Sequence, residues 1–195
     1  LFLDVLFGMF VLAGWERIIV PENYAQLHYL NFNFPYSHSL AAGIVWSLVV
    51  FGVMYMIWRG DKHSRFSVSL TLSGAVLIHW ICDWIVHPPQ LPVAGMNSNQ
   101  VGLGLWNHLQ VALTLEAALV VVGMVLNLIA VKETNQKGRW VILGFISVIG
   151  LFALIGQAKV TQVPDVTTIA GSMIVQIVVV CGIVAWFDRN REIDK

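Results

Sequence analysis

The chain has 195 residues, of which 57% are hydrophobic and 11% charged, and its mean hydropathy is +0.75. Such a composition excludes a water-soluble globular domain. Eleven Lys and Arg residues balance eleven Asp and Glu residues, which excludes the basic excess that draws nucleic acid through its phosphates.

Six apolar stretches are suited to crossing a bilayer core, which requires roughly 20 residues of helix. They are Leu1 to Val20, Ser39 to Trp58, Phe66 to Val86, Gly104 to Val131, Trp140 to Gln157 and Val166 to Phe187. The connections are short. We therefore expect one all-α transmembrane domain over residues 1–195, a six-helix bundle. Because the chain opens inside an apolar run, LFLD, we also expect a further N-terminal segment before Leu1.

The first stretch carries one ionisable residue, Asp4, and ends near the charged pair Glu16 and Arg17. Ionisable groups at membrane depth cost about 3 kcal/mol or more, so each suggests a functional site. Asp4 is about 18 Å from Glu16 along a continuous helix. If Glu16 and Arg17 protrude into the outer aqueous layer, Asp4 reaches the depth of His79 on the third stretch.

The second stretch begins with PYSHSL, in which Ser37, His38 and Ser39 are expected to form the first helical turn. A histidine at the start of a helix is commonly an interfacial side chain whose polar tip reaches water. The position of His38 on the same membrane face as the end of the third stretch makes a metal ligand the second interpretation.

The third stretch contains HWICDWIVHPP, with His79, Asp83 and His87 spaced by four residues. This spacing places all three on one stripe of a helix. Histidine and carboxylate side chains so arranged can bind one divalent metal ion. The alternative is a hydrogen-bonded pair of His79 and Asp83 that neutralises itself inside the bundle.

The fourth stretch begins with GLGLWNHLQVALTLE, in which His108 and Glu116 share a face with the small Ala112 between them. Glu116 is expected near mid-membrane, where an unpaired carboxylate is protonated. It is either a neutral group bonded to a neighbouring helix or, with His108, a catalytic or supporting residue.

The basic residues divide unequally between the two sides of the six-helix arrangement. Nine lie in the even-numbered loops and the tail: Arg59, Lys62, Arg65, Lys132, Lys137, Arg139, Arg189, Arg191 and Lys195. Arg17 and Lys159 lie on the other side. Because cytoplasmic loops carry the excess of Lys and Arg, we expect a cytoplasmic C-terminus.

The motifs PYSHSL, HWICDWIVHPPQLP and GLGLWN, in this order, resemble the bacterial membrane-bound predicted metal-dependent hydrolases, the LexA-regulated inner-membrane family. The resemblance covers about Leu1 to Glu116. That family is thought to be distantly related to zinc-dependent phospholipase C, an all-helical fold. The resemblance implies metal ligands at Asp4, His38, His79 and Asp83, with His87 as a further candidate.

Three functions remain open from the sequence. The first is an inner-membrane hydrolase that uses zinc, manganese or iron to cleave an ester or phosphoester of a lipid or lipid-linked substrate. The second is a proton-coupled transporter in which Asp4, His79, Asp83 and Glu116 form a relay. The third is a non-catalytic subunit of a membrane complex, whose polar residues serve helix packing.

Overall fold

The computed structural model describes residues 1–130, 136–160 and 162–188, and the described part is mainly helical. In chain order its elements are α1 (Phe2–Leu12), β1 (Arg17–Ile19), α2 (Tyr24–Leu27), β2 (Asn31–Asn33), α3 (Leu40–Ile57), α4 (Lys62–Val86), β3 (Leu91–Pro92), β4 (Gln100–Val101), the 3-10 helix η1 (Leu105–His108), α5 (Leu109–Ala130), α6 (Gln136–Lys159) and α7 (Val166–Asp188).

Four helices of the described chain are long and apolar enough to cross a membrane, namely Leu40–Ile57, Lys62–Val86, Leu105–Ile129 and Val166–Trp186. Two further apolar helices, Phe2–Leu12 and Leu143–Lys159, are shorter. These helices indicate a membrane protein. Each of the six stretches expected from the sequence overlaps one of these helices, but only four of the helices meet the length and hydropathy of a membrane span.

The first helix ends at Leu12, so the expectation of a continuous helix to Val20 is wrong. Gly14 adopts a left-handed conformation with φ of 77°, which glycine tolerates without steric cost. The N–H groups of Trp15 and Glu16 donate to the Phe10 carbonyl at 2.8 and 3.2 Å, which closes the helix. The chain then continues as β1, which pairs antiparallel with β2.

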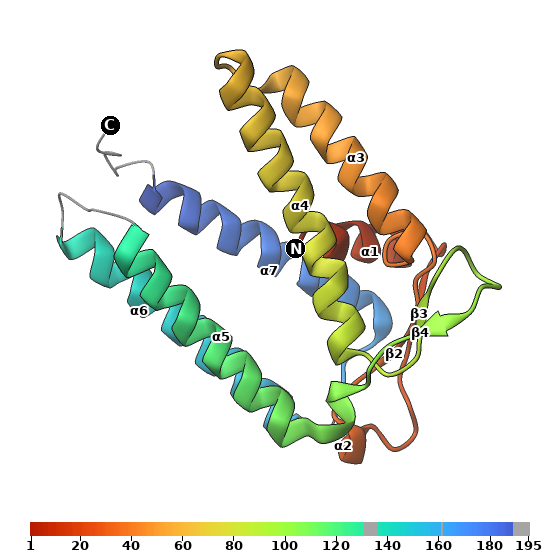
Figure 1. Cartoon of the computed structure of the whole chain (residues 1–195). Coiled ribbons are helices and arrows are strands. Elements are labelled where there is room, and N and C mark those ends of the chain that lie inside the picture. The colour runs from red at the N-terminus through yellow and green to blue at the C-terminus, as the bar shows by residue number, and fades with distance from the viewer. Residues whose placement is uncertain (131–135, 161, 189–195) are drawn as a thin grey trace.

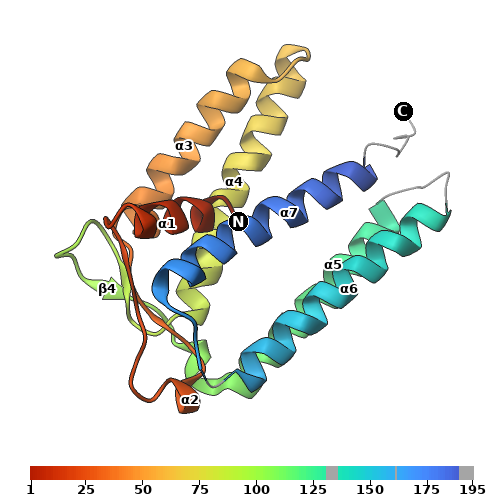
Figure 2. The ribbon, with the colours of Figure 1, turned by 180° about the vertical axis from the view of Figure 1, so that it is seen from behind.

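The two long hairpins, α3–α4 and α5–α6, diverge from the end of the molecule that holds the short strands (Figures 1 and 2). Helix α3 begins where the Ser39 hydroxyl accepts a hydrogen bond from the Ala42 N–H at 3.0 Å. Helix α4 ends at Val86, and Pro88 and Pro89 follow its C-cap residue His87. The short helix α1 packs along α7 beside the base of α3 and α4.

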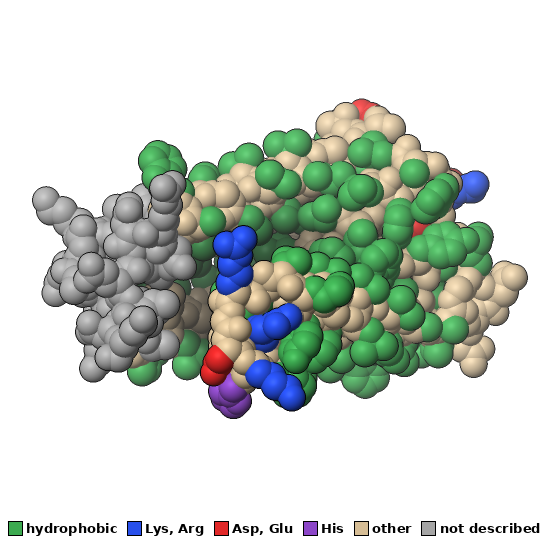
Figure 3. Space-filling view, turned by 90° about the horizontal axis from the view of Figure 1, so that it is seen from above, with side chains coloured by type: hydrophobic (Ala, Val, Ile, Leu, Met, Phe, Trp, Pro, Cys, Tyr) green, Lys and Arg blue, Asp and Glu red, His purple; other side chains and the backbone are tan. Residues whose placement is uncertain are grey.

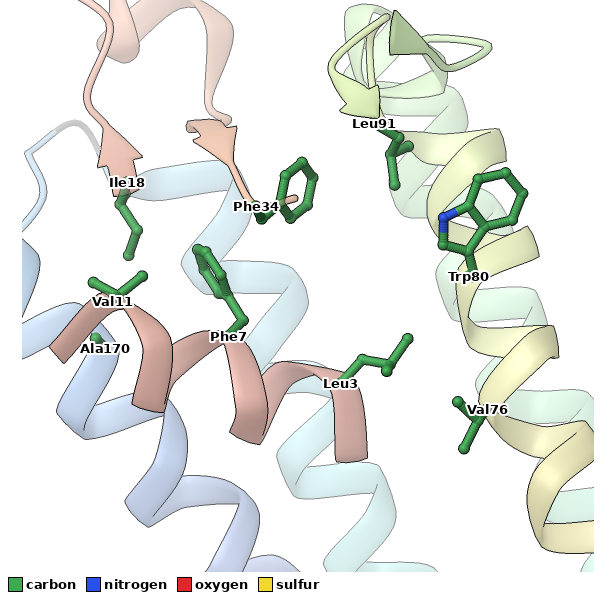
Figure 4. Close-up of a cluster of buried hydrophobic side chains, with 9 residues drawn as sticks. All are labelled: Leu3, Phe7, Val11, Ile18, Phe34, Val76, Trp80, Leu91 and Ala170. Atoms are coloured by element: carbon green, nitrogen blue, oxygen red, sulfur yellow. The ribbon is translucent and has the colours of Figure 1, made fainter. Parts of the chain in front are cut away.

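A hydrophobic core joins these elements at the strand end (Figure 4). Leu3, Phe7 and Val11 project from α1 into a cluster that also contains Ile18, Phe34, Val76, Trp80, Leu91 and Ala170. A Cβ atom on Gly8 would lie 2.7 Å from the Ile174 side chain and 3.2 Å from the Ala170 carbonyl oxygen. The absence of a side chain at Gly8 therefore allows α1 to approach α7 closely, and the core places the first turn of α1 next to α4.

The turn between α3 and α4 is basic and lies at the far end of that hairpin from the strands (Figure 1). It carries Arg59, Lys62 and Arg65, and Figure 3 shows Lys and Arg side chains gathered beside a largely hydrophobic surface. Arg17 lies in β1, at the opposite end. This separation agrees with the division expected from the sequence, although Lys132, Arg189, Arg191 and Lys195 lie outside the described residues.

Candidate metal centre

Four ionisable side chains from three separate parts of the sequence meet where α1, the start of α3 and α4 come together. Asp4 lies in the first turn of α1, His38 precedes α3, and His79 and Asp83 lie one turn apart on α4. The Nε2 atoms of His38 and His79 lie 3.7 and 3.5 Å from Asp4 Oδ1. The same two atoms lie 3.6 and 3.3 Å from Asp83 Oδ2.

These four nitrogen–oxygen distances are too long for ordinary hydrogen bonds, which measure about 2.7–3.2 Å. Ligand atoms held at about 2.0–2.1 Å from a tetrahedral zinc ion are about 3.3 Å apart, close to the distances in this cluster. His79 Nε2 and Asp83 Oδ2 are buried and have no hydrogen-bond partner in the described chain. Because buried polar atoms are normally paired, this arrangement fits a cation placed between the imidazoles and the carboxylates.

Potential ligand atoms of Asp4, His38 and His79 all lie within 4.8 Å of one another. Asp83 is not a member of this mutually close group, but its Oδ2 atom lies near both imidazoles. Oxygen and nitrogen ligands without a thiolate suit zinc, manganese or iron. The residues present therefore fit a divalent transition-metal ion.

A buried carboxylate outside the cluster determines the orientation of His38. Glu16 is 2% exposed, so the expectation that it protrudes into water is wrong. Its Oε1 accepts hydrogen bonds from the backbone N–H groups of Tyr36 and Ser37 at 2.7 and 2.8 Å, and its Oε2 accepts one from the Ser37 hydroxyl at 2.6 Å. Burial raises the pKa of Glu16, and the hydrogen bonds from Ser37 and Tyr36 oppose that effect.

The Ser37 hydroxyl also lies 2.7 Å from His38 Nδ1. Because Ser37 donates its hydrogen to the Glu16 carboxylate, its oxygen must accept from His38 Nδ1–H. The His38 Nε2 lone pair then faces the carboxylates, as a metal ligand requires. Sequence reasoning missed this role of Glu16, because 21 residues separate it from Ser37.

His38 is also held by Trp80, whose indole N–H donates to the His38 carbonyl at 2.8 Å. The rings of Phe34 and His38 stack with centroids 5.0 Å apart. Trp80 is buried on the same helix as His79 and Asp83. His38 is thus attached directly to the helix that carries His79 and Asp83.

His87 lies near the cluster but has a different environment. Its Nδ1 atom lies 2.7 Å from Gln90 Nε2, and the Oε1 atom of the same amide accepts the Phe32 N–H at 3.0 Å. Burial lowers the pKa of His87 to about 3, so this ring is neutral at neutral pH. Its ring centroid is 4.1 Å from that of Trp106.

A cavity of about 190 Å³ connects His87 to the cluster. Asp4, His38, Asp83 and His87 contribute its polar lining, and the remaining lining residues are Phe7, Phe32, Phe34, Trp106 and Met173. The potential ligands therefore border a small space with mainly aromatic walls.

The two remaining residues predicted to act in catalysis lie apart from this cavity lining. His108 is exposed at the end of η1. Glu116 lies on α5 and forms a side-chain hydrogen bond with Gln157 of α6. The Glu116 contact corresponds to the first of its two interpretations, a group bonded to a neighbouring helix.

Comparisons of the chain with protein-family models, with curated proteins and with solved structures gave no match.

Proposed function

We propose that the protein is a membrane-embedded metal-dependent hydrolase whose ion is held by His38 and His79 through Nε2, by Asp4 and by Asp83. The observation that supports this proposal best is the set of four nitrogen–oxygen distances of 3.3–3.7 Å, in which His79 Nε2 and Asp83 Oδ2 are buried without a hydrogen-bond partner in the described chain. A self-contained His79–Asp83 pair explains neither the convergence of Asp4 and His38 nor the length of these contacts.

A divalent ion bound there supplies a Lewis acid and lowers the pKa of a water molecule. The protein side chains orient the ligand and keep bulk water out. Glu16 and Ser37 keep the His38 lone pair directed at the ion, and the aromatic walls of the cavity exclude bulk water from the scissile group. The cavity of about 190 Å³ accommodates the reacting end of a substrate rather than a whole lipid, since pockets for drug-sized ligands measure about 300–1,000 Å³.

The setting favours an ester or phosphoester of a lipid or lipid-linked molecule. His79 also borders an apolar cavity of about 650 Å³ between α1, α3 and α4, lined by residues such as Val49, Val53 and Leu72. An apolar cavity between membrane-spanning helices suits the hydrocarbon chain of a lipid. In line with the family resemblance, the proposed location is a bacterial inner membrane, with six helices in the bilayer and the C-terminus in the cytoplasm.

Hydrolysis of chromogenic compounds by the full chain in detergent tests this proposal. The panel comprises a p-nitrophenyl carboxylic ester, a phosphomonoester and a phosphodiester, assayed after chelation and after reloading with zinc or manganese. Turnover of at least one compound only in the loaded protein, and its loss in His79→Ala, are the expected results. Protein that retains metal but cleaves none of the three ester types would contradict the hydrolase assignment and leave the metal centre standing.

A further inference from the structure

The hydrogen bonds of Gln90 determine which nitrogen of His87 carries the proton. The Phe32 N–H can only donate, so the Gln90 atom that it contacts at 3.0 Å must be the amide oxygen. The amide nitrogen therefore faces His87 Nδ1 at 2.7 Å and donates to it. A neutral imidazole that accepts at Nδ1 carries its hydrogen on Nε2.

This proton arrangement is the reverse of that in His38. His38 donates through Nδ1 to Ser37 and directs a lone pair toward the cluster, whereas His87 accepts through Nδ1 and keeps an N–H at Nε2. An imidazole nitrogen that carries hydrogen cannot ligate a metal ion. No acceptor in the described chain contacts His87 Nε2, and the side chain lines the cavity beside the cluster.

We propose that this cavity binds the reacting oxygen-bearing group of the substrate, and that His87 Nε2–H donates a hydrogen bond to one of its oxygens instead of ligating the metal. The inference rests on the proposed function, because the metal ion would hold the same group from the other side. The acceptor is an oxygen of a carboxylic ester or a phosphoester. Donors aimed at such an oxygen stabilise the negative charge that it gains during hydrolysis.

The surroundings of His87 hold its ring in place for this role. Trp106 lies against one side of the imidazole, and Phe34, with its ring centroid 5.6 Å away, lies near another. The His87 carbonyl accepts the Gly104 N–H at 2.7 Å. A Cβ atom on Gly102 would lie 2.5 Å from that same carbonyl oxygen, so a glycine is required where this loop passes the end of α4.

Nitrogen-15 NMR of histidine-labelled full chain in micelles tests the proton arrangement directly. In the metal-free protein we expect His38 to be protonated at Nδ1 and His87 at Nε2. Zinc should shift the Nε2 resonances of His38 and His79 to metal-bound values and leave His87 Nε2 protonated. A metal-bound resonance at His87 Nε2, or a proton on His87 Nδ1, would overturn the inference while leaving the metal centre intact.

Calorimetry with inorganic phosphate and with acetate tests the substrate contact in zinc-loaded protein, since these anions stand in for the two kinds of product. His87→Phe should keep the zinc stoichiometry of the wild type and bind one or both anions about tenfold more weakly, as expected for one lost hydrogen bond. His87→Gln, which retains an N–H donor, should recover part of the loss. The control His63→Phe alters an exposed histidine near the start of α4 and should change neither quantity.

Loss of zinc in His87→Phe, or unchanged binding of both anions, would overturn the role assigned to His87. Wild type that binds no zinc would instead overturn the proposed function. The two failures are therefore distinguishable.

Discussion

The direction of the side-chain hydrogen bonds to His38 and His87 is set by a neighbouring group that can only donate or only accept. A backbone N–H sets the orientation of the Gln90 amide, and a carboxylate sets that of the Ser37 hydroxyl. Supporting partners of this kind commonly change metal affinity by about 10–100-fold when they are altered. The proposed chemistry of the cluster would thus depend on supporting residues such as Glu16, which does not itself contact the potential metal ligands.

Glu16→Gln is the sharpest test of this dependence, because it preserves size and replaces one accepting oxygen with a donating nitrogen. The amide oxygen can still accept the backbone N–H groups, but the amide nitrogen donates to Ser37 and turns the Ser37 hydroxyl toward His38 Nδ1. His38 then carries its proton on Nε2 and loses its lone pair at the metal. We expect zinc affinity, measured by chelator competition, to fall about 10–100-fold.

Ser37→Ala serves as the comparison, because it removes the contact without imposing the wrong tautomer on His38. Its loss of affinity should be smaller than that of Glu16→Gln. Equal zinc affinity in wild type and Glu16→Gln would show that Glu16 has no influence on the ligand.

Local sequence patterns could predict only part of the cluster. The spacing of His79 and Asp83 on one helix stripe is visible in the sequence, because both residues lie on the same element. The convergence of Asp4 and His38 with them was expected from their membrane depth and from the family resemblance, but it depends on how α1 crosses the bundle, which no local pattern encodes. The contact between Glu16 and Ser37 joins two segments that are distant in the sequence, and helical spacing gives no information about such contacts.

Among the elements, α1 has the most demanding position, because an 11-residue helix must place Asp4 beside α4 while packing on α7. The close approach at Gly8 makes this possible. The bounds of α3 and α7 agree within one residue with the stretches Ser39 to Trp58 and Val166 to Phe187, because sustained hydropathy and capping residues are local signals. The end of α1 was missed because the apolar run continues past it to Val20. The helix ends where Gly14 takes a left-handed conformation and Glu16 turns into the protein interior.

Gly8→Leu should separate α1 from α7, because even a Cβ atom at this position meets Ile174 and the Ala170 carbonyl. Overpacking of this kind costs about 1–3 kcal/mol. We expect a lower thermal midpoint in detergent together with weaker zinc binding, since Asp4 moves with α1. Gly52→Leu on α3 is the matched control, because a Cβ atom there has no neighbour within 4 Å. Equal midpoints and zinc contents in the two variants would contradict the packing role of Gly8.

At the scale of the whole molecule, the basic α3–α4 turn and the strand end lie at opposite ends of a membrane-spanning hairpin. The excess of Lys and Arg predicts that the α3–α4 turn lies in the cytoplasm. In that orientation the proposed metal centre, at the strand end of α4, would lie near the non-cytoplasmic face. This orientation decides from which side a water-soluble reagent reaches the site.

Cysteine labelling in intact cells tests the orientation. The native Cys82 and Cys181 are exposed in the chain and are first replaced by alanine. An impermeant maleimide added from outside should label Met96→Cys, at the strand end, and should label Lys62→Cys only after the membrane is opened. Labelling of Lys62→Cys in intact cells would reverse the orientation.

Metal content measured by elemental analysis tests the central claim most directly. Full chain purified in detergent and loaded with zinc, manganese or iron should carry about one ion per chain, and His38→Ala, His79→Ala and Asp83→Ala should each lose most of it. Combining two of these changes should add little, because ligands of one ion act together. Wild type that remains below about a tenth of an ion per chain after loading, or a His38→Ala variant with undiminished metal, would contradict the site, since structural zinc sites bind far more tightly.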